Sequence, residues 1–241
     1  MVSTTNNSEK TANKTFQLAI ATFNVQNLFS AGSNPVVTKA GYITAEKELV
    51  KRRKLILAVE RELGLPEILA LQEVGDAQIL HKLASGLNEA AGTAYQSAAP
   101  ATSDRRGIRL GFLWDEARVE KEAIMQMSGA DVAAAFGQSS PNPGREPLAG
   151  LFQIKGRRIM IINNHFKSNF IPEANLHLAE PLLLANAAQR RAQAAVLQAF
   201  AAPRLARNPQ ELLLITGDFN DGSTTAKINF RLLTSSFSAV I

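Results

Sequence analysis

The sequence of 241 residues contains no cysteine, which excludes disulfides, thiolate metal sites and a cysteine nucleophile. Aromatic residues make up only 6% of the chain, and only three histidines are present. The best apolar stretch, residues 176–188, is too broken by Glu180, Pro181 and Asn186 to cross a bilayer. The chain also lacks a P-loop, a Gly-x-Ser-x-Gly elbow and a His-Glu-x-x-His helix. Its chemistry therefore has to rest on carboxylates, amides, basic groups and few histidines.

The remaining composition is that of a globular protein with enough apolar residues, 46%, to build a large core. Residues 1–15 are rich in Ser, Thr, Asn and Lys and predict a disordered tail before one large α/β domain at 16–241. The tail has no apolar core of a secretion signal, so the chain as written is expected to be cytoplasmic, with secretion left open. A net charge of +5 fits a polyanionic partner and a merely basic surface equally well.

Four short apolar runs each end in polar residues. They predict buried strands that present side chains at their carboxyl ends, where open α/β sheets bind ligands. Carboxylate and amide oxygens are ligands for a hard cation, and a histidine beside them can transfer a proton. Hydrolysis of a phosphate ester is the reaction class that suits these groups. The polar residues at the four ends are Asn24, Glu73, Asn164 with His165, and Asp218 with Asn220.

Each of these clusters also has an ordinary structural interpretation. A glutamate after a strand is usually a solvated turn residue, and residues 217–221, Gly-Asp-Phe-Asn-Asp, make a good turn by composition alone. A single histidine at a strand end is more often structural than catalytic. His165 is nevertheless the strongest of the three, because His81 lies on a predicted helix and His177 in a loop-to-helix stretch.

Hydrophobic spacing predicts alternating strands and helices, and hence α/β layers. The buried stripe of the first helix is expected to contain Leu49, Ile56 and Val59. A second helix is expected after an N-cap at Asp76, and residues 128–147 are expected to form an irregular surface loop. The other predicted elements are strands at 16–24, 67–74, 95–98, 107–114 and 211–216, a hairpin of 148–155 and 157–164, and helices at 44–63 and 185–201.

A basic loop precedes the strand predicted at 107–114. Arg105 and Arg106, with Arg109 at the start of the strand, place three guanidinium groups at its mouth. Arginine makes bidentate contacts to phosphate, although a solubilising loop explains the same charges equally well. Lys167, two residues after His165, is a further candidate for phosphate contact.

Taken in order, the motifs resemble those of the endonuclease/exonuclease/phosphatase superfamily, which includes deoxyribonuclease-I-like nucleases, exonuclease III-type repair enzymes, inositol polyphosphate phosphatases and bacterial sphingomyelinases. Residues 105–108 and 190–194 resemble its bacterial nuclease-like branch. The resemblance implies a four-layered α/β/β/α sandwich of two mixed β-sheets with outer helices. The motifs are Phe23-Asn24-Val25-x-Asn27-Leu28, Leu71-Gln72-Glu73-Val74, Asn164-His165-Phe166-Lys167-Ser168 and Gly217-Asp218-Phe219-Asn220-Asp221.

Carried over by position, the resemblance implies that Glu73 binds a metal ion, Mg²⁺ or Mn²⁺, with Asn24 nearby. It implies a general-acid or phosphate-stabilising role for His165. Asp218 and Asn220 would position the attacking water and the transition state. The reaction implied is hydrolysis of a phosphodiester or phosphomonoester. Together with the basic loop, the predicted substrate-binding residues are Asn24, Arg105, Arg106, Arg109, Asn164 and Lys167.

The sequence departs from the family pattern at its end. The family's last motif is an Asp-His pair on a late strand, and residues 222–241 contain neither Asp nor His. We therefore expect a C-terminally incomplete domain that lacks strands of the second sheet, and a truncated, inactive chain stays open. The leading hypothesis is an endonuclease-type phosphodiesterase acting on nucleic acid, in the first place DNA. The alternatives are a non-catalytic phosphate- or nucleic-acid-binding remnant, and a lipid or inositol phosphatase, which an exposed apolar rim near the site would favour.

Overall fold

Two mixed β-sheets form the centre of the protein in a computed structural model that describes residues 17–35, 41–102, 104, 106–127, 145–209 and 211–221. Arg105 and most of the predicted loop at 128–147 lie outside these residues. The strands of the first sheet, in spatial order, are β1 (Ile20–Leu28), β2 (Ile68–Val74), β4 (Arg109–Asp115) and β3 (Tyr95–Ala98). Those of the second are β5 (Glu120–Gln126), β6 (Leu148–Ile154), β7 (Arg157–His165) and β8 (Leu212–Asp218).

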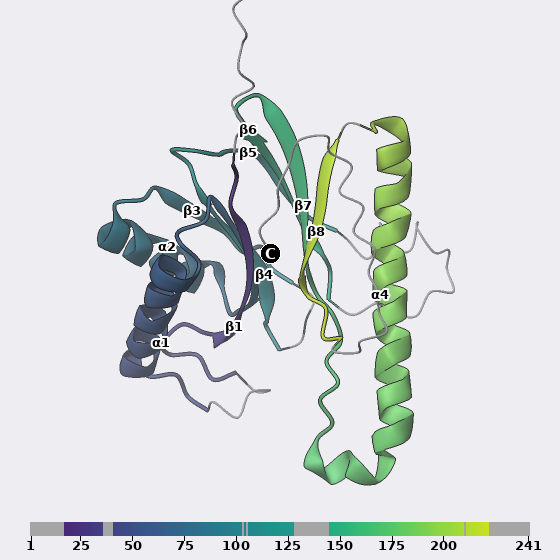
Figure 1. The fold of residues 1–241 in the computed structure, drawn as a ribbon. Coiled ribbons are helices and arrows are strands. Elements are labelled where there is room, and N and C mark those ends of the chain that lie inside the picture. Colours follow the sequence, from purple (N-terminus) through teal and green to yellow (C-terminus); the bar gives the residue numbers. More distant parts are fainter. Residues whose placement is uncertain are drawn as a thin grey trace, which may run out of the picture.

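Each sheet contains one parallel pair of strands, and these two pairs determine where the site lies. β1 runs parallel to β2 with Asn24 opposite Gln72, and β7 runs parallel to β8 with His165 opposite Asp218. The other neighbours are antiparallel. Because β1 and β2 also contact β8, the carboxyl ends of all four parallel strands meet at one end of the sandwich (Figure 1).

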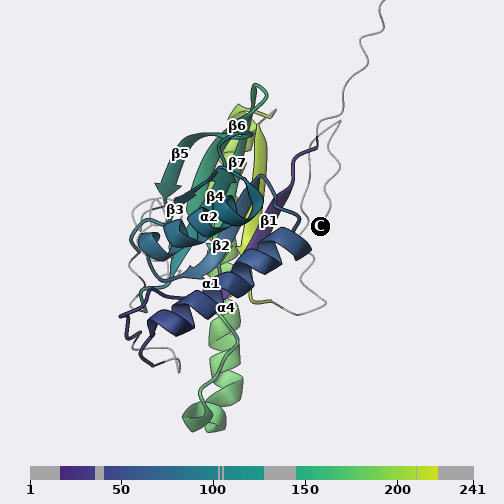
Figure 2. The ribbon, with the colours of Figure 1, turned by 90° about the vertical axis from the view of Figure 1, so that its left-hand side faces the viewer.

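Helices cover the outer face of both sheets, which completes the four layers (Figures 1 and 2). The helix α1 (Ala45–Leu57), which continues into a π-helical turn η1 (Ala58–Glu62), and the helix α2 (Ala77–Ala91) pack on the first sheet. On the second sheet lies α4 (Ala179–Arg207), preceded by a 3₁₀ turn η2 (Glu173–Leu178). The predicted α/β/β/α sandwich of two mixed sheets is confirmed. None of the described helices is long and apolar enough to cross a membrane.

The inner faces of the two sheets bury a core of large apolar side chains. Phe112 of β4 and Phe152 of β6 meet edge to face, with ring centroids 5.6 Å apart, and Trp114 packs beside them. One polar bridge crosses this core near the site. The Nδ2 of Asn163 donates to the carbonyls of Leu71 and Gly111 at 2.9 and 3.0 Å, so an amide of the second sheet joins two strands of the first.

Several sequence predictions about the elements need correction. β1 runs to Leu28, beyond the predicted end at residue 24, through a register irregularity where Gln26 and Asn27 have positive φ. The helix predicted at 185–201 is longer, because its proline at 181 lies in the first turn, where no backbone donor is needed. β5 was not predicted, since its sequence EKEAIMQ lacks clear apolar alternation.

The predicted buried stripe of α1 is also partly wrong. Leu49 is 37% exposed, whereas Glu48 and Leu55 are buried. Glu48 can be buried because its carboxylate accepts the backbone N–H of Ala31 at 2.8 Å and pairs with Lys82 at 3.1 Å. These contacts keep the pKa of Glu48 below its usual value although burial opposes ionisation. A charged residue therefore takes a position that an apolar residue was expected to fill.

Candidate active site at the ends of four strands

Four predicted site residues, one from each parallel strand, meet at a common point. The side-chain amide of Asn24, at the irregular part of β1, donates to Glu73 Oε1 at 3.1 Å and to Asp218 Oδ2 at 2.8 Å. The Nε2 of His165 lies 3.6 Å from Glu73 Oε1 and 3.9 Å from Asp218 Oδ2. Two carboxylates, an amide and an imidazole from distant parts of the chain therefore share one small volume.

The backbone at Glu73 turns its carboxylate toward this point. Val74 pairs with Arg109 of β4 one residue out of register with Gln72, so Glu73 is the extra residue of a bulge. Its φ of +66° lies in the left-handed region, which side chains other than glycine rarely adopt. Asn220, on the other side of the site, has a φ of +50°. Strain of this kind is retained where a local conformation is required, and functional sites are common examples.

His165 is buried, with only 4% of its surface exposed. Burial lowers its pKa to about 4, an effect that the negative charge of Asp218 opposes and the positive charge of Arg106 reinforces. The imidazole is therefore neutral at physiological pH and has one donor and one acceptor nitrogen. Its Nδ1 is buried and has no hydrogen-bond partner among the described residues.

The loop after β8 is fastened to the end of β7. Asp218 Oδ1 accepts the backbone N–H of Asn220 at 2.9 Å, which closes a tight turn at the site. Asn220 Nδ2 donates to the carbonyl of Phe166 at 3.0 Å, and the Phe166 N–H donates to the carbonyl of Asp218 at 2.8 Å. The side chains of Asp218 and Glu73 stay partly open, at 28% and 19% exposure, so solvent and substrate can reach them.

The residues predicted to bind phosphate have other contacts in this structure. Arg106 makes a bidentate pair with Asp104, with Nη2 2.8 Å from Oδ2, and Arg109 donates to the carbonyl of Ala99 at 3.2 Å. Asn164 donates to two strand carbonyls, those of Ile162 and Thr216, at 2.9 and 3.0 Å. Arg105 lies outside the described residues. Substrate contact by these residues and by Lys167 stays a prediction.

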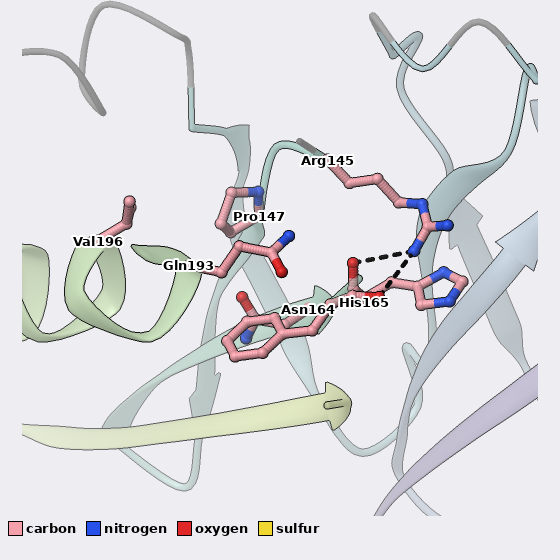
Figure 3. Close-up of a pocket in the computed structure, with 7 residues that line it drawn as sticks. Arg145, Pro147, Asn164, His165, Gln193 and Val196 are labelled. Carbon is pink, nitrogen blue, oxygen red and sulfur yellow. Dashed lines mark hydrogen bonds between the residues drawn. The ribbon is translucent and has the colours of Figure 1, made fainter. Parts of the chain in front are cut away.

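Sequence reasoning missed two residues near the site. Arg145, just before β6, lines a small pocket with Asn164, His165, Gln193 and other residues (Figure 3). Its only sequence signal was a positive charge in a loop rich in glycine and proline. Lys51 of α1 lies close enough to Glu73 for that charge to raise its pKa, while burial lowers it below the usual value overall. It had been counted with the surface charges of a helix.

The donor set suits a hard cation better than a soft one. Glu73 and Asp218 direct carboxylate oxygens toward the same amide nitrogen, and Mg²⁺ or Mn²⁺ prefers such oxygens and keeps several waters. Within the described part of the chain, no group of three or more His, Cys, Asp or Glu residues could enclose an ion. A cation here would therefore be held by Glu73 with waters and substrate oxygens, and not by a closed protein cage.

Comparison with known proteins agrees with this arrangement. A family model described as "Endonuclease/Exonuclease/phosphatase family" matches residues 19–236, nearly the whole described domain. The chain belongs to this family. No curated protein matches the sequence.

Solved structures give the same fold at low sequence identity. A humanized TDP2 from D. rerio is 15% identical, with a TM-score of 0.51 over 86% of this chain and 63% of that one. The human Nocturnin catalytic domain with bound sulfate is 16% identical, with a TM-score of 0.45, over 71% and 57%. A family protein from Bacteroides thetaiotaomicron is 15% identical, with a TM-score of 0.49, over 87% and 66%. The chain thus spans less than two thirds of each of these structures.

Proposed function

We propose that this protein is a metal-dependent phosphodiesterase of the endonuclease type, acting on nucleic acid and in the first place on DNA. Family membership supports a phosphoester hydrolase in general. The observation that supports the proposal most strongly is the meeting of Glu73, His165 and Asp218 around Asn24 at the open end of the sandwich.

The residues divide the work according to their exposure and charge. Asp218 is partly open to solvent and held by the Asn220 turn, so it can orient a water molecule and accept its proton. His165 is buried and neutral, so it can donate a hydrogen bond to a phosphate oxygen or a leaving group without carrying a charge. When bound at Glu73, a divalent cation would neutralise charge on the phosphate. Asn24 keeps the two carboxylates at a fixed separation by donating to both.

Basic charge beside the site favours a polyanionic substrate. α1 carries the run Lys51-Arg52-Arg53-Lys54, and Lys51 lies within electrostatic reach of Glu73. The chain as a whole has a net charge of +5. Phosphates on either side of a scissile bond would meet this helix, and such contacts give nucleic-acid binding that weakens as salt rises.

A plasmid-nicking assay with Mg²⁺ tests the proposal. The wild-type protein is expected to convert supercoiled DNA to the open circle, and Asp218→Ala and His165→Ala are expected to reduce the rate at least ~100-fold. Asp115→Ala, a change at the far end of β4, serves as the matched control. Undiminished nicking by both site variants would refute the site assignment. Salt-sensitive DNA binding without turnover would support the non-catalytic alternative instead.

A second candidate, a phosphatase or phosphodiesterase of lipid substrates, is favoured by one feature. After β7 the chain leaves the site, and η2 with the first turns of α4 projects beyond the strand ends (Figure 1). Exposed apolar surface of this size is unusual in a free monomer. Hydrolysis of a phospholipid in vesicles at a higher rate than DNA would favour this candidate. The exposed side chains of the segment are Phe170 at 68%, Leu176 at 59%, Leu178 at 45%, Leu183 at 41% and Leu184 at 65%.

A further inference from the structure

Arg145 joins three separate segments of the chain beside the candidate active site. Its Nε lies 2.9 Å from Asp104 Oδ2, in the loop before β4. Its Nη1 donates to the carbonyl of His165 at 3.1 Å and to that of Phe166 at 3.2 Å (Figure 3). The guanidinium therefore connects a loop of the first sheet to the end of β7 in the second.

The partner Asp104 is built to hold an arginine in a fixed direction. Its side chain is only 9% exposed, and that of Arg145 only 12%. Burial alone would raise the pKa of Asp104, but hydrogen bonds from the side chain and backbone of Arg106 outweigh it and lower that pKa. Asp104 is therefore a carboxylate at neutral pH, shared between two arginines.

The two carbonyls that Arg145 contacts belong to the residues that orient the site. His165 supplies the imidazole, and Phe166 is hydrogen-bonded to both ends of the Asp218–Asn220 turn. The carbonyl of Phe166 accepts from Arg145 and Asn220 together. A shift of this one peptide would therefore move the imidazole and the carboxylate turn at the same time.

We propose that Arg145 is a positioning residue for the hydrolytic reaction, fixing the backbone of His165 and Phe166, and that Asp104 fixes Arg145. The catalytic part of this inference rests on the proposed function. Charge-assisted hydrogen bonds to carbonyls are stronger than neutral ones, and a planar fork satisfies three acceptors where a lysine cannot. Direct binding of a substrate phosphate is the competing role for an arginine in this place.

The test compares Arg145→Gln, Arg145→Lys and the matched control Arg158→Gln. Arg158 is at the start of β7, its side chain is 68% exposed, and it pairs with Glu122 away from the site. For each variant, kcat and KM are measured with a phosphodiester substrate, and exchange of the Phe166 amide hydrogen is measured by NMR. Arg145→Gln should lower kcat ~10–100-fold with KM within ~3-fold of wild type. Exchange of the Phe166 amide should become faster, because its bond to Asp218 loosens.

Arg145→Lys should recover part of both effects, since it keeps the charge but loses the fork, and Arg158→Gln should match the wild type. Wild-type kcat together with wild-type amide exchange in Arg145→Gln would overturn the proposal. So would a rise in KM alone, which marks a phosphate ligand. If Arg145→Gln does not fold, the lysine variant decides by the same two measurements. If the wild type cleaves no substrate, the proposed function fails, while the exchange experiment still shows whether Arg145 holds the turn.

Discussion

Replacement of Gly217 by alanine should damage both the fold and the site, by an amount that the structure allows us to estimate. Gly217 pairs with Asn164 across the parallel strands β8 and β7, and its φ is +134°, where residues with a side chain are strained. A Cβ there would press on the carbonyl oxygen of Asn164 and lie 2.6 Å from its nitrogen. These are backbone atoms that cannot rotate away. Strain of about 1–3 kcal/mol and overpacking of similar size together predict a loss of about 3–5 kcal/mol.

Gly156→Ala is the matched control for this prediction. Gly156 lies in the turn between β6 and β7 with a φ of +77°, but a Cβ there would meet no atom within 4 Å. Only the conformational strain remains, about 1–2 kcal/mol. Urea denaturation of both variants measures the difference. A Gly217→Ala variant no less stable than Gly156→Ala would refute the reasoning from close approach of the two strands.

Two further predictions concern the interior beside the site. Because the folded pKa of His165 is about 4 and the model value is 6.5, unfolding takes up a proton below pH 6.5. The free energy of unfolding should therefore be unaffected by this group above pH 6.5 and fall by up to about 3 kcal/mol between pH 6.5 and 4. His165→Gln should flatten that part of the curve, and an unchanged slope would contradict the assignment. Asn163→Ala should cost about 2–4 kcal/mol, measured by urea denaturation against the exposed Asn208→Ala, because it leaves Gln72 Nε2 and the carbonyls of Leu71 and Gly111 short of partners; equal stabilities would contradict it.

Local patterns in the sequence predicted the framework well. Asp76 caps α2 as expected, accepting the N–H of Ile79 at 2.8 Å, and the hairpin turns at Gly156. Both follow from contacts within a few residues. The ends of β1, β2, β7 and β8 could be identified because each apolar run stops at polar residues. That these ends meet follows from the carboxyl-end rule for parallel strands, and the structure brings Asn24, Glu73, His165 and Asp218 together.

What the sequence could not predict depends on contacts between distant segments. Arg145 resembles any loop arginine until the fold places it against Asp104 and His165. Arg106 was expected to face a phosphate, yet it pairs with its own neighbour Asp104. Glu48 is buried because Lys82 and Ala31 reach it from other segments. In each case the partner lies outside the window that propensity and periodicity examine.

The central claim is that Glu73 and Asp218 act with a divalent cation on a phosphate ester. The most direct measurement is the rate of phosphodiester hydrolysis as a function of Mg²⁺ concentration, for the wild type and for Glu73→Gln. We predict a saturable dependence on Mg²⁺ in the wild type, no hydrolysis in EDTA, and a requirement for at least ~10-fold more Mg²⁺ in the variant. Hydrolysis that persists in EDTA, or the same Mg²⁺ dependence in both proteins, would contradict the claim.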